Sequence, residues 1–283
     1  MMDDHSRPQS SQTTRPPQRI AIAGLGAIGL KVAQALDAGL PGLALVAVAG
    51  RDKSKTAAQA ASLRCAPEVL DLAALADTAD VIVDCAPSAS FATLATSVVD
   101  AGRMLMTVNA GALLRHLDLV ERAKATGARI VVPTGALLGL DAVRAAAEGH
   151  IERVTMITRK PPGGLDGAPY LVERGITLAG LTEAKCIFEG NAVEGAKGFP
   201  ANVNVAAALG LAGVGPERTR LQIWADPAVD RNTHTIEVEA DSARLSLRIE
   251  NVPSAENPRT GKITALSVIA CLRGLTAPLR VGT

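Results

Sequence analysis

Short apolar runs alternate with helical stretches along the first half of the chain. The first apolar run surrounds Ile20 and Ile22, and the later ones are Leu43–Ala49, Val81–Asp84, Met104–Val108 and Ala128–Val132. Between them, apolar residues recur at helical spacing over 53–63, 71–76, 91–101 and 113–126. Strands and helices that alternate at these lengths predict βαβ units. We therefore expect an α/β fold with a doubly wound parallel sheet in this half.

The pattern changes from about Asp141 onward. Strand-like runs lie at Val154–Thr158, Ala184–Phe188, Leu221–Ala225, Thr233–Ala240 and Ala243–Ile249, and helical ones at Ala201–Leu211 and Ile263–Leu275. The tight link Asp241-Ser242 predicts an antiparallel hairpin, and residues 159–164 read as a loop. We expect a second α+β domain with a mixed, mostly antiparallel sheet. The last helix is amphipathic, so we expect it to pack back on the first domain.

A glycine-rich loop, Gly24-Leu25-Gly26-Ala27-Ile28-Gly29, stands between the first strand and the helix after it. Its G-x-G-x-x-G spacing in this position is typical of a Rossmann-type dinucleotide site. Gly24 allows a tight turn, Gly26 lets a pyrophosphate approach the backbone, and Gly29 lets helix and strand pack closely. The free N–H groups of the helix N-terminus attract the phosphates. A tight turn without a ligand is the alternative. We assign cofactor contacts to Gly24, Gly26, Ala27, Ile28 and Gly29.

The turn after the second strand bears on the choice between NAD and NADP. An acidic residue there binds the ribose 2′-hydroxyl, whereas an arginine accommodates a 2′-phosphate. This chain has Gly50-Arg51-Asp52, in which Arg51 can pair with the phosphate and Asp52 lies late for the hydroxyl. We expect NADP to be accepted and NAD not to be excluded. Alternatively, both residues are surface charges at a helix start.

Composition narrows the function classes. The 283 residues are 48% hydrophobic but 2% aromatic, which suits a parallel sheet under helices. The formal net charge is +1 without a basic stripe, so we expect neither nucleic acid nor membrane as a partner. The four cysteines lie far apart without zinc-site spacing, which predicts free thiols and no metal. With no signal peptide or bilayer-length apolar run, we expect a cytoplasmic protein.

These patterns divide the chain into four parts. Residues 1–18, rich in Ser, Gln, Pro, Thr and Arg, are expected to form a disordered tail. We expect a dinucleotide-binding domain at 19–140, a substrate and catalytic domain at 141–255, and a C-terminal helical segment at 256–283.

His234 is the main candidate for chemistry. Hydride transfer needs an acid or base to move a proton, and the chain has four histidines. Alternation along the strand places His234 on the apolar face with Ile236 and Val238, so it points to a core or a pocket. An ordinary buried histidine is the alternative. A second domain that closes over a nicotinamide favours the catalytic interpretation.

Asn204 is a candidate ligand-binding residue. It lies in the first turn of the helix that follows Phe199-Pro200. Asn202 is better placed to cap that helix, which leaves the Asn204 amide to hydrogen-bond a carboxamide such as that of nicotinamide.

Six strings resemble the L-aspartate dehydrogenase family. They are the glycine-rich loop, NAGAL at 109–113, PTGAL at 133–137, RKPP at 159–162, FPANVNVA at 199–206 and NTHTI at 232–236. The loop is generic, but FPANVNVA and NTHTI together are specific. The resemblance implies oxidation of L-aspartate with NAD or NADP to oxaloacetate and ammonia through iminoaspartate, which can feed NAD biosynthesis.

The resemblance also implies residue roles. The family's catalytic histidine falls at His234, and its cofactor-binding asparagine at Asn204. A cofactor-contacting alanine of the family falls at Leu138, where this chain departs from the pattern. The two substrate carboxylates need cationic partners, for which the candidates are Arg159, Lys160 and Lys197.

Two other functions stay open. One is an imine or aldehyde reductase of the dihydrodipicolinate reductase or homoserine dehydrogenase type, and the other is a non-catalytic dinucleotide-binding redox sensor. We also expect a homodimer, because a second-domain sheet with an apolar outer face would need cover.

Overall fold

The computed structural model describes residues 16–200, 204–254 and 260–282. Over these residues the first sheet has six strands in the order β3-β2-β1-β4-β5-β6, all parallel. The strands are β1 (Gln18–Ala23), β2 (Leu43–Ala49), β3 (Glu68–Val69), β4 (Val81–Asp84), β5 (Met104–Thr107) and β6 (Arg129–Val131). The expected doubly wound sheet is confirmed, with its switch point between β1 and β4. The short strand β3 escaped the sequence analysis.

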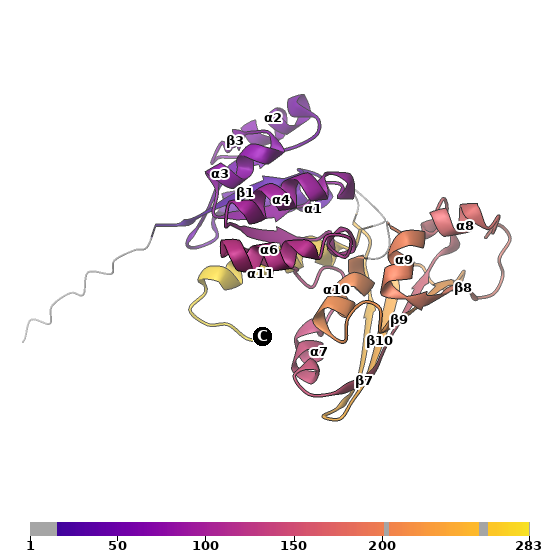
Figure 1. Ribbon diagram of the computed structural model, residues 1–283. Coiled ribbons are helices and arrows are strands. Elements are labelled where there is room, and N and C mark those ends of the chain that lie inside the picture. Colours follow the sequence, from indigo (N-terminus) through magenta and orange to yellow (C-terminus); the bar gives the residue numbers. More distant parts are fainter. Residues whose placement is uncertain (1–15, 201–203, 255–259, 283) are drawn as a thin grey trace, which may run out of the picture.

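Helices cover both faces of this sheet (Figure 1). They are α1 (Ala27–Gly39), α2 (Lys53–Ala61), α3 (Leu75–Thr78), α4 (Phe91–Asp100), α5 (Ala110–Leu113) and α6 (Asp118–Thr126), with short 3₁₀ turns η1 (Leu72–Ala74) and η2 (Ser88–Ser90). On one face, α4 and α6 bury Leu94, Val98 and Leu119. On the other, α1 packs beside the C-terminal helix α11 (Lys262–Thr276), which buries Val268 and Leu272. Helix α11 thus lies on the first domain, as expected from its apolar face.

The helix predicted at Leu113–Thr126 begins only at Asp118, as α6; Leu113 is the last residue of the short helix α5, and residues 114–117 separate the two. The apolar period continues through the break, which is why the sequence indicated one helix. Asp118 and Glu121 lie in the first turn of α6, where carboxylates suit a helix N-terminus.

The second sheet has the order β11-β10-β7-β9-β8. Its strands are β7 (Ile151–Lys160), β8 (Lys185–Asn191), β9 (Thr219–Ala225), β10 (Thr233–Ala240) and β11 (Arg244–Glu250). Only the β7–β9 pair is parallel among the described strands of this sheet, which confirms a mixed, mostly antiparallel sheet. The β10–β11 hairpin is also confirmed. The loop expected from Arg159 was wrong, because β7 continues through Lys160.

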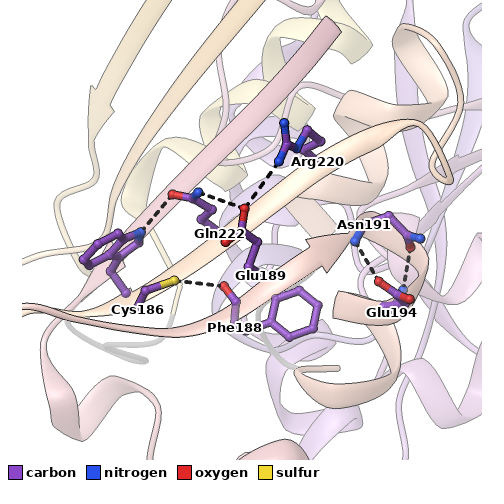
Figure 2. A network of polar contacts seen from close by, with 8 residues as sticks. Cys186, Phe188, Glu189, Asn191, Glu194, Arg220 and Gln222 are labelled. Atoms are coloured by element: carbon purple, nitrogen blue, oxygen red, sulfur yellow. Dashed lines mark hydrogen bonds and ion pairs between the residues drawn. The ribbon is translucent and has the colours of Figure 1, made fainter.

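Helices α7 (Leu140–Ala147), α8 (Pro169–Glu173), α9 (Ala192–Gly198) and α10 (Asn204–Ala212), with the 3₁₀ turn η3 (Pro162–Gly164), belong to the second domain. A capping box between Asn191 and Glu194 starts α9 (Figure 2). Helix α10 contacts α5 of the first domain. It also contacts α7 of the second domain (Figure 1). The expected helix start at 201–203 and the expected tail at 1–15 lie outside the described residues.

The face of the second sheet turned away from these helices is polar. Trp224 Nε1 donates to Gln222 Oε1 at 3.1 Å, and Gln222 Nε2 donates to Glu189 Oε1 at 3.3 Å. Arg220 pairs with the same carboxylate at 3.5 Å (Figure 2). The apolar outer face assumed for a dimer is therefore wrong for these strands. In the part of the chain that is described, no helix has the length and apolar character to cross a membrane.

Candidate active site

The glycine-rich loop has the geometry of a pyrophosphate cradle. Gly24 has a φ of +91°, and a Cβ there would stand 2.7 Å from the Cys85 carbonyl oxygen. A Cβ on Gly29 would stand 1.9 Å from the Gly24 oxygen, so helix and strand touch at this point. A Cβ on Gly26 would meet nothing within 4 Å. Gly26 is the N-cap of α1, and no side chain caps that end. Open space beside uncapped N–H groups fits a dinucleotide phosphate.

Arg51 and Asp52 lie exposed in the turn after β2. Asp52 Oδ1 accepts a hydrogen bond from the Lys55 N–H at 3.0 Å and so caps α2. Because the Asp52 carboxylate already caps α2, Arg51 is the charged side chain of this turn that can bind a ribose phosphate.

A cavity of about 140 Å³ lies between the two domains. The first domain contributes Ile28, Ala110 and the segment 132–136, while α11 contributes Thr264. The second domain contributes Lys160, Asn204, His234 and Asn251. The structure thus gathers four of the predicted site residues at this cavity: Ile28 of the glycine-rich loop, Lys160, Asn204 and His234.

His234 is buried at this cavity, with 3% of its surface exposed. It faces Thr158 across the β10–β7 pair, and a hydrogen bond of 3.1 Å joins Thr158 Oγ1 and His234 Nδ1. Burial, and then the nearby Lys160 charge, lowers the pKa of His234 from 6.5 to about 3. The imidazole is therefore neutral near pH 7, and Nε2 is the ring nitrogen left for a ligand.

Lys160 ends β7 and is 4% exposed. Burial lowers the pKa of its ammonium from 10.5 to about 8, so the group stays mostly charged near neutral pH. A largely desolvated cation on a ligand cavity suits a carboxylate.

The other two candidate cations point elsewhere. Arg159 pairs with Asp226 at 3.1 Å, and its guanidinium lies 4.7 Å from the centre of the Trp224 ring. Lys197 is exposed on α9 and does not line the cavity. Arg159 and Lys160 are neighbours on β7, and successive side chains of a strand face opposite sides of the sheet, so only Lys160 reaches the cavity.

Asn204 begins α10, and its Oδ1 accepts a hydrogen bond from the Gly111 N–H at 3.0 Å. The amide N–H groups of Asn204 can therefore donate hydrogen bonds to a ligand. Leu138 is half-buried and does not line the cavity, whereas Ala136 does. The departure from the family pattern at Leu138 thus lies beside this edge of the cavity.

Comparisons with known proteins agree with this architecture. Residues 24–133 match the family described as homoserine dehydrogenase, NAD binding domain, and residues 141–275 match aspartate dehydrogenase, C-terminal. The L-aspartate dehydrogenase of Bradyrhizobium diazoefficiens is 55% identical over 282 residues, which cover 100% of both chains. This chain belongs to the L-aspartate dehydrogenase family. Its first domain is an NAD-binding domain.

Other relatives support the same family. L-aspartate dehydrogenase 3 of Bordetella bronchiseptica is 51% identical over 96% of this chain and 100% of its own. The crystal structure of an aspartate dehydrogenase from Thermotoga maritima has a TM-score of 0.74 at 24% identity, covering 94% of this chain and 99% of that one. At that identity the solved structure supports the fold.

Two buried polar side chains of this family member, Asn251 and Asp84, were not predicted from the sequence. Asn251 directly follows β11, is 4% exposed and lines the cavity. Asp84, at the carboxyl end of β4, is fully buried. For Asp84, the signal available was a carboxylate at the end of a fully buried strand; β11 is not buried, so Asn251 had no such signal. In the described ranges, no group of three or more His, Cys, Asp or Glu side chains could hold a metal.

Proposed function

We propose that this protein oxidises L-aspartate at Cα with NAD or NADP, yielding iminoaspartate and then oxaloacetate and ammonia. One observation carries the proposal: a neutral, buried His234 lies on the cavity between the NAD-binding domain and the second sheet. The 55% identity with the Bradyrhizobium L-aspartate dehydrogenase supports L-aspartate as the substrate.

His234 acts as the base in this mechanism. A bound nicotinamide ring supplies the acceptor for the Cα hydride. Thr158 holds Nδ1 and orients the ring, so Nε2 takes a proton from the substrate ammonium. Substrate carboxylates entering beside His234 raise its pKa from about 3 and make it a better base. The protonated histidine then releases this proton to solvent, and the neutral imidazole takes a proton from the water that attacks the imine carbon.

Lys160 binds a substrate carboxylate in this scheme, and Arg159 and Lys197 do not. The cofactor is held by the loop Gly24–Gly29, with Arg51 at the ribose end. Asn204 and the segment 136–138, with Leu138, lie at its nicotinamide end. The donor groups of the Asn204 amide suit a carboxamide oxygen, because Oδ1 already accepts from Gly111.

The proposal extends to the cellular setting. We take 19–140 as the dinucleotide domain, 141–255 as the substrate domain and 256–283 as the C-terminal segment. The enzyme would act in the cytoplasm as a homodimer and feed NAD biosynthesis. If the outer face of the second sheet forms that dimer, its polar side chains join through hydrogen bonds and ion pairs, so dissociation rises with salt. Sedimentation equilibrium at low and high salt tests this.

The activity is tested with purified protein, L-aspartate, and NAD or NADP in parallel. Reduced-nicotinamide absorbance should rise with L-aspartate and not with D-aspartate or L-glutamate. Absence of any change, also with oxaloacetate, ammonia and reduced cofactor, would leave the imine reductase or the redox sensor as the function.

A further inference from the structure

Asn251 lines the cavity and carries a deeply buried amide oxygen. Its Nδ2 donates to the Ala136 carbonyl oxygen at 3.0 Å. That oxygen can only accept, so the amide orientation is fixed and Oδ1 lies on the other side. Oδ1 is buried and has no hydrogen-bond partner within the described part of the chain. A buried acceptor without a donor is costly, which makes it a candidate for a donor on a ligand.

Gly261 packs directly against the Asn251 side chain. A Cβ on Gly261 would stand 2.9 Å from Asn251 Oδ1. The backbone there has φ −71° and ψ 141°, a conformation that any residue adopts. Glycine is therefore not needed for the turn. Its effect at this position is to let the Asn251 amide lie against the backbone without a clash at Oδ1.

We propose that Asn251 Oδ1 accepts a hydrogen bond from the α-nitrogen of L-aspartate. This inference rests on the proposed function. The Asn251 N–H donates to the Asn232 oxygen at 2.8 Å, which holds Asn251 next to the chain that enters the His234 strand. Lys160 and the Asn204 amide present donors, which suit carboxylate and carboxamide oxygens. The substrate nitrogen carries only donors, so it needs an acceptor such as Oδ1.

A neutral acceptor suits the chemistry better than a carboxylate. A carboxylate beside the substrate ammonium would raise the pKa of the ammonium and oppose its deprotonation. An amide oxygen accepts an N–H from the ammonium, the amine and the iminium alike. Asn251 can thus hold the nitrogen in place while His234 removes a proton from it.

Asn251→Ala and Gly261→Ala test this, because one removes the acceptor and the other crowds it. We expect each to raise the KM for L-aspartate roughly tenfold or more, as for a lost hydrogen bond to a charged group. The Ki of succinate, which lacks the nitrogen, should stay within about twofold of the wild type. Gly274→Ala is the matched control on the same helix, because a Cβ there meets nothing within 4 Å. It should change neither constant.

Equal weakening of succinate and L-aspartate would overturn the proposal, because it would indicate a general role in packing. The nicotinamide carboxamide is a second source of N–H donors. In 3-acetylpyridine adenine dinucleotide a methyl group replaces that NH₂. If Asn251→Ala weakened NAD but not this analogue, the acceptor would serve the cofactor and the proposal would be wrong.

Calorimetric titration of L-aspartate and succinate into NADPH-loaded protein gives the same comparison without turnover. A wild type that binds L-aspartate but does not oxidise it would contradict the proposed function alone. Unchanged L-aspartate affinity in both variants would contradict the role of Asn251. Should Asn251→Ala fail to fold, Gly261→Ala still decides, because it keeps the Asn251 side chain and acts by crowding Oδ1.

Discussion

Two buried polar clusters in this protein differ in how completely their hydrogen bonds are made. The Asp84 cluster (Asp84, Thr107 and Asn109) lies inside the first domain. Asp84 Oδ2 accepts from Thr107 Oγ1 at 2.7 Å and from Asn109 Nδ2 at 2.9 Å, and Oδ1 accepts from the Ala86 N–H at 3.1 Å. The cavity cluster (Thr158, Lys160, His234 and Asn251) lies between the domains. There, among the residues described, Asn251 Oδ1 has no donor.

This contrast indicates that the Asp84 cluster stabilises the fold, whereas the cavity cluster forms the active site. A closed network rigidifies the backbone that carries it, here the carboxyl ends of β4 and β5. Burial raises the pKa of Asp84, and the three donations oppose that shift. A buried acceptor without a donor lowers the stability of the protein, and a ligand that supplies the donor can restore it. We therefore expect changes in the Asp84 cluster to alter stability and changes in the cavity cluster to alter turnover.

The largest expected effect follows replacement of His234 by Ala. Loss of the base should lower kcat by about 100- to 10,000-fold, the usual contribution of general base catalysis. Cofactor affinity, measured by fluorescence titration, should stay near the wild-type value. His150→Ala, at an exposed histidine outside the cavity, is the control and should retain full turnover. A wild-type kcat in His234→Ala would contradict the assignment of catalysis to the cavity cluster.

Asp84→Ala should act on stability instead. It removes the acceptor of the Thr107 hydroxyl and one of the two acceptors of Asn109 Nδ2, and we expect the free energy of unfolding to fall by roughly 2–4 kcal/mol. Urea denaturation measures this, with the exposed Asp77→Ala as control. If turnover per folded molecule fell as far as in His234→Ala while stability held, the Asp84 cluster would belong to the site.

Acid should destabilise the protein partly through His234. Its folded pKa of about 3 lies below the unfolded value of 6.5, so between these values the unfolded chain binds the extra proton. This contribution to stability is complete above the unfolded pKa and is lost as pH falls toward the folded one. Unfolding free energies at about pH 7 and about pH 4.5 should differ less in His234→Gln than in the wild type. Equal differences would mean that His234 titrates normally.

The smallest expected effect concerns the edge of the cofactor site. Arg51→Ala should raise the KM for NADP by roughly fivefold, in keeping with an exposed ion pair, and leave the KM for NAD nearly unchanged. Lys53→Ala is the control, because its ammonium pairs with Asp71 on the surface. An equal change for both cofactors would place the 2′-phosphate elsewhere.

The sequence predicted strand bounds best where both faces of a strand are buried. Strands β2 and β4 lie within a sheet covered on both faces, so they read as continuous apolar runs, and their predicted bounds match the structure. The end of β7 was misread because Lys160 looks like a loop residue, although burial at a ligand cavity explains it. Asn251 could not be assigned, because its partner Ala136 lies 115 residues away and nothing local indicates that contact.

The central claim is that this cavity moves the Cα hydrogen of L-aspartate directly to the dinucleotide held by the first domain. Mass spectrometry of the reduced cofactor, after turnover of L-aspartate deuterated at Cα in ordinary water, tests it most directly. The account predicts one deuterium on the reduced nicotinamide ring of every cofactor molecule formed. Unlabelled reduced cofactor, with the deuterium lost to solvent, would contradict it.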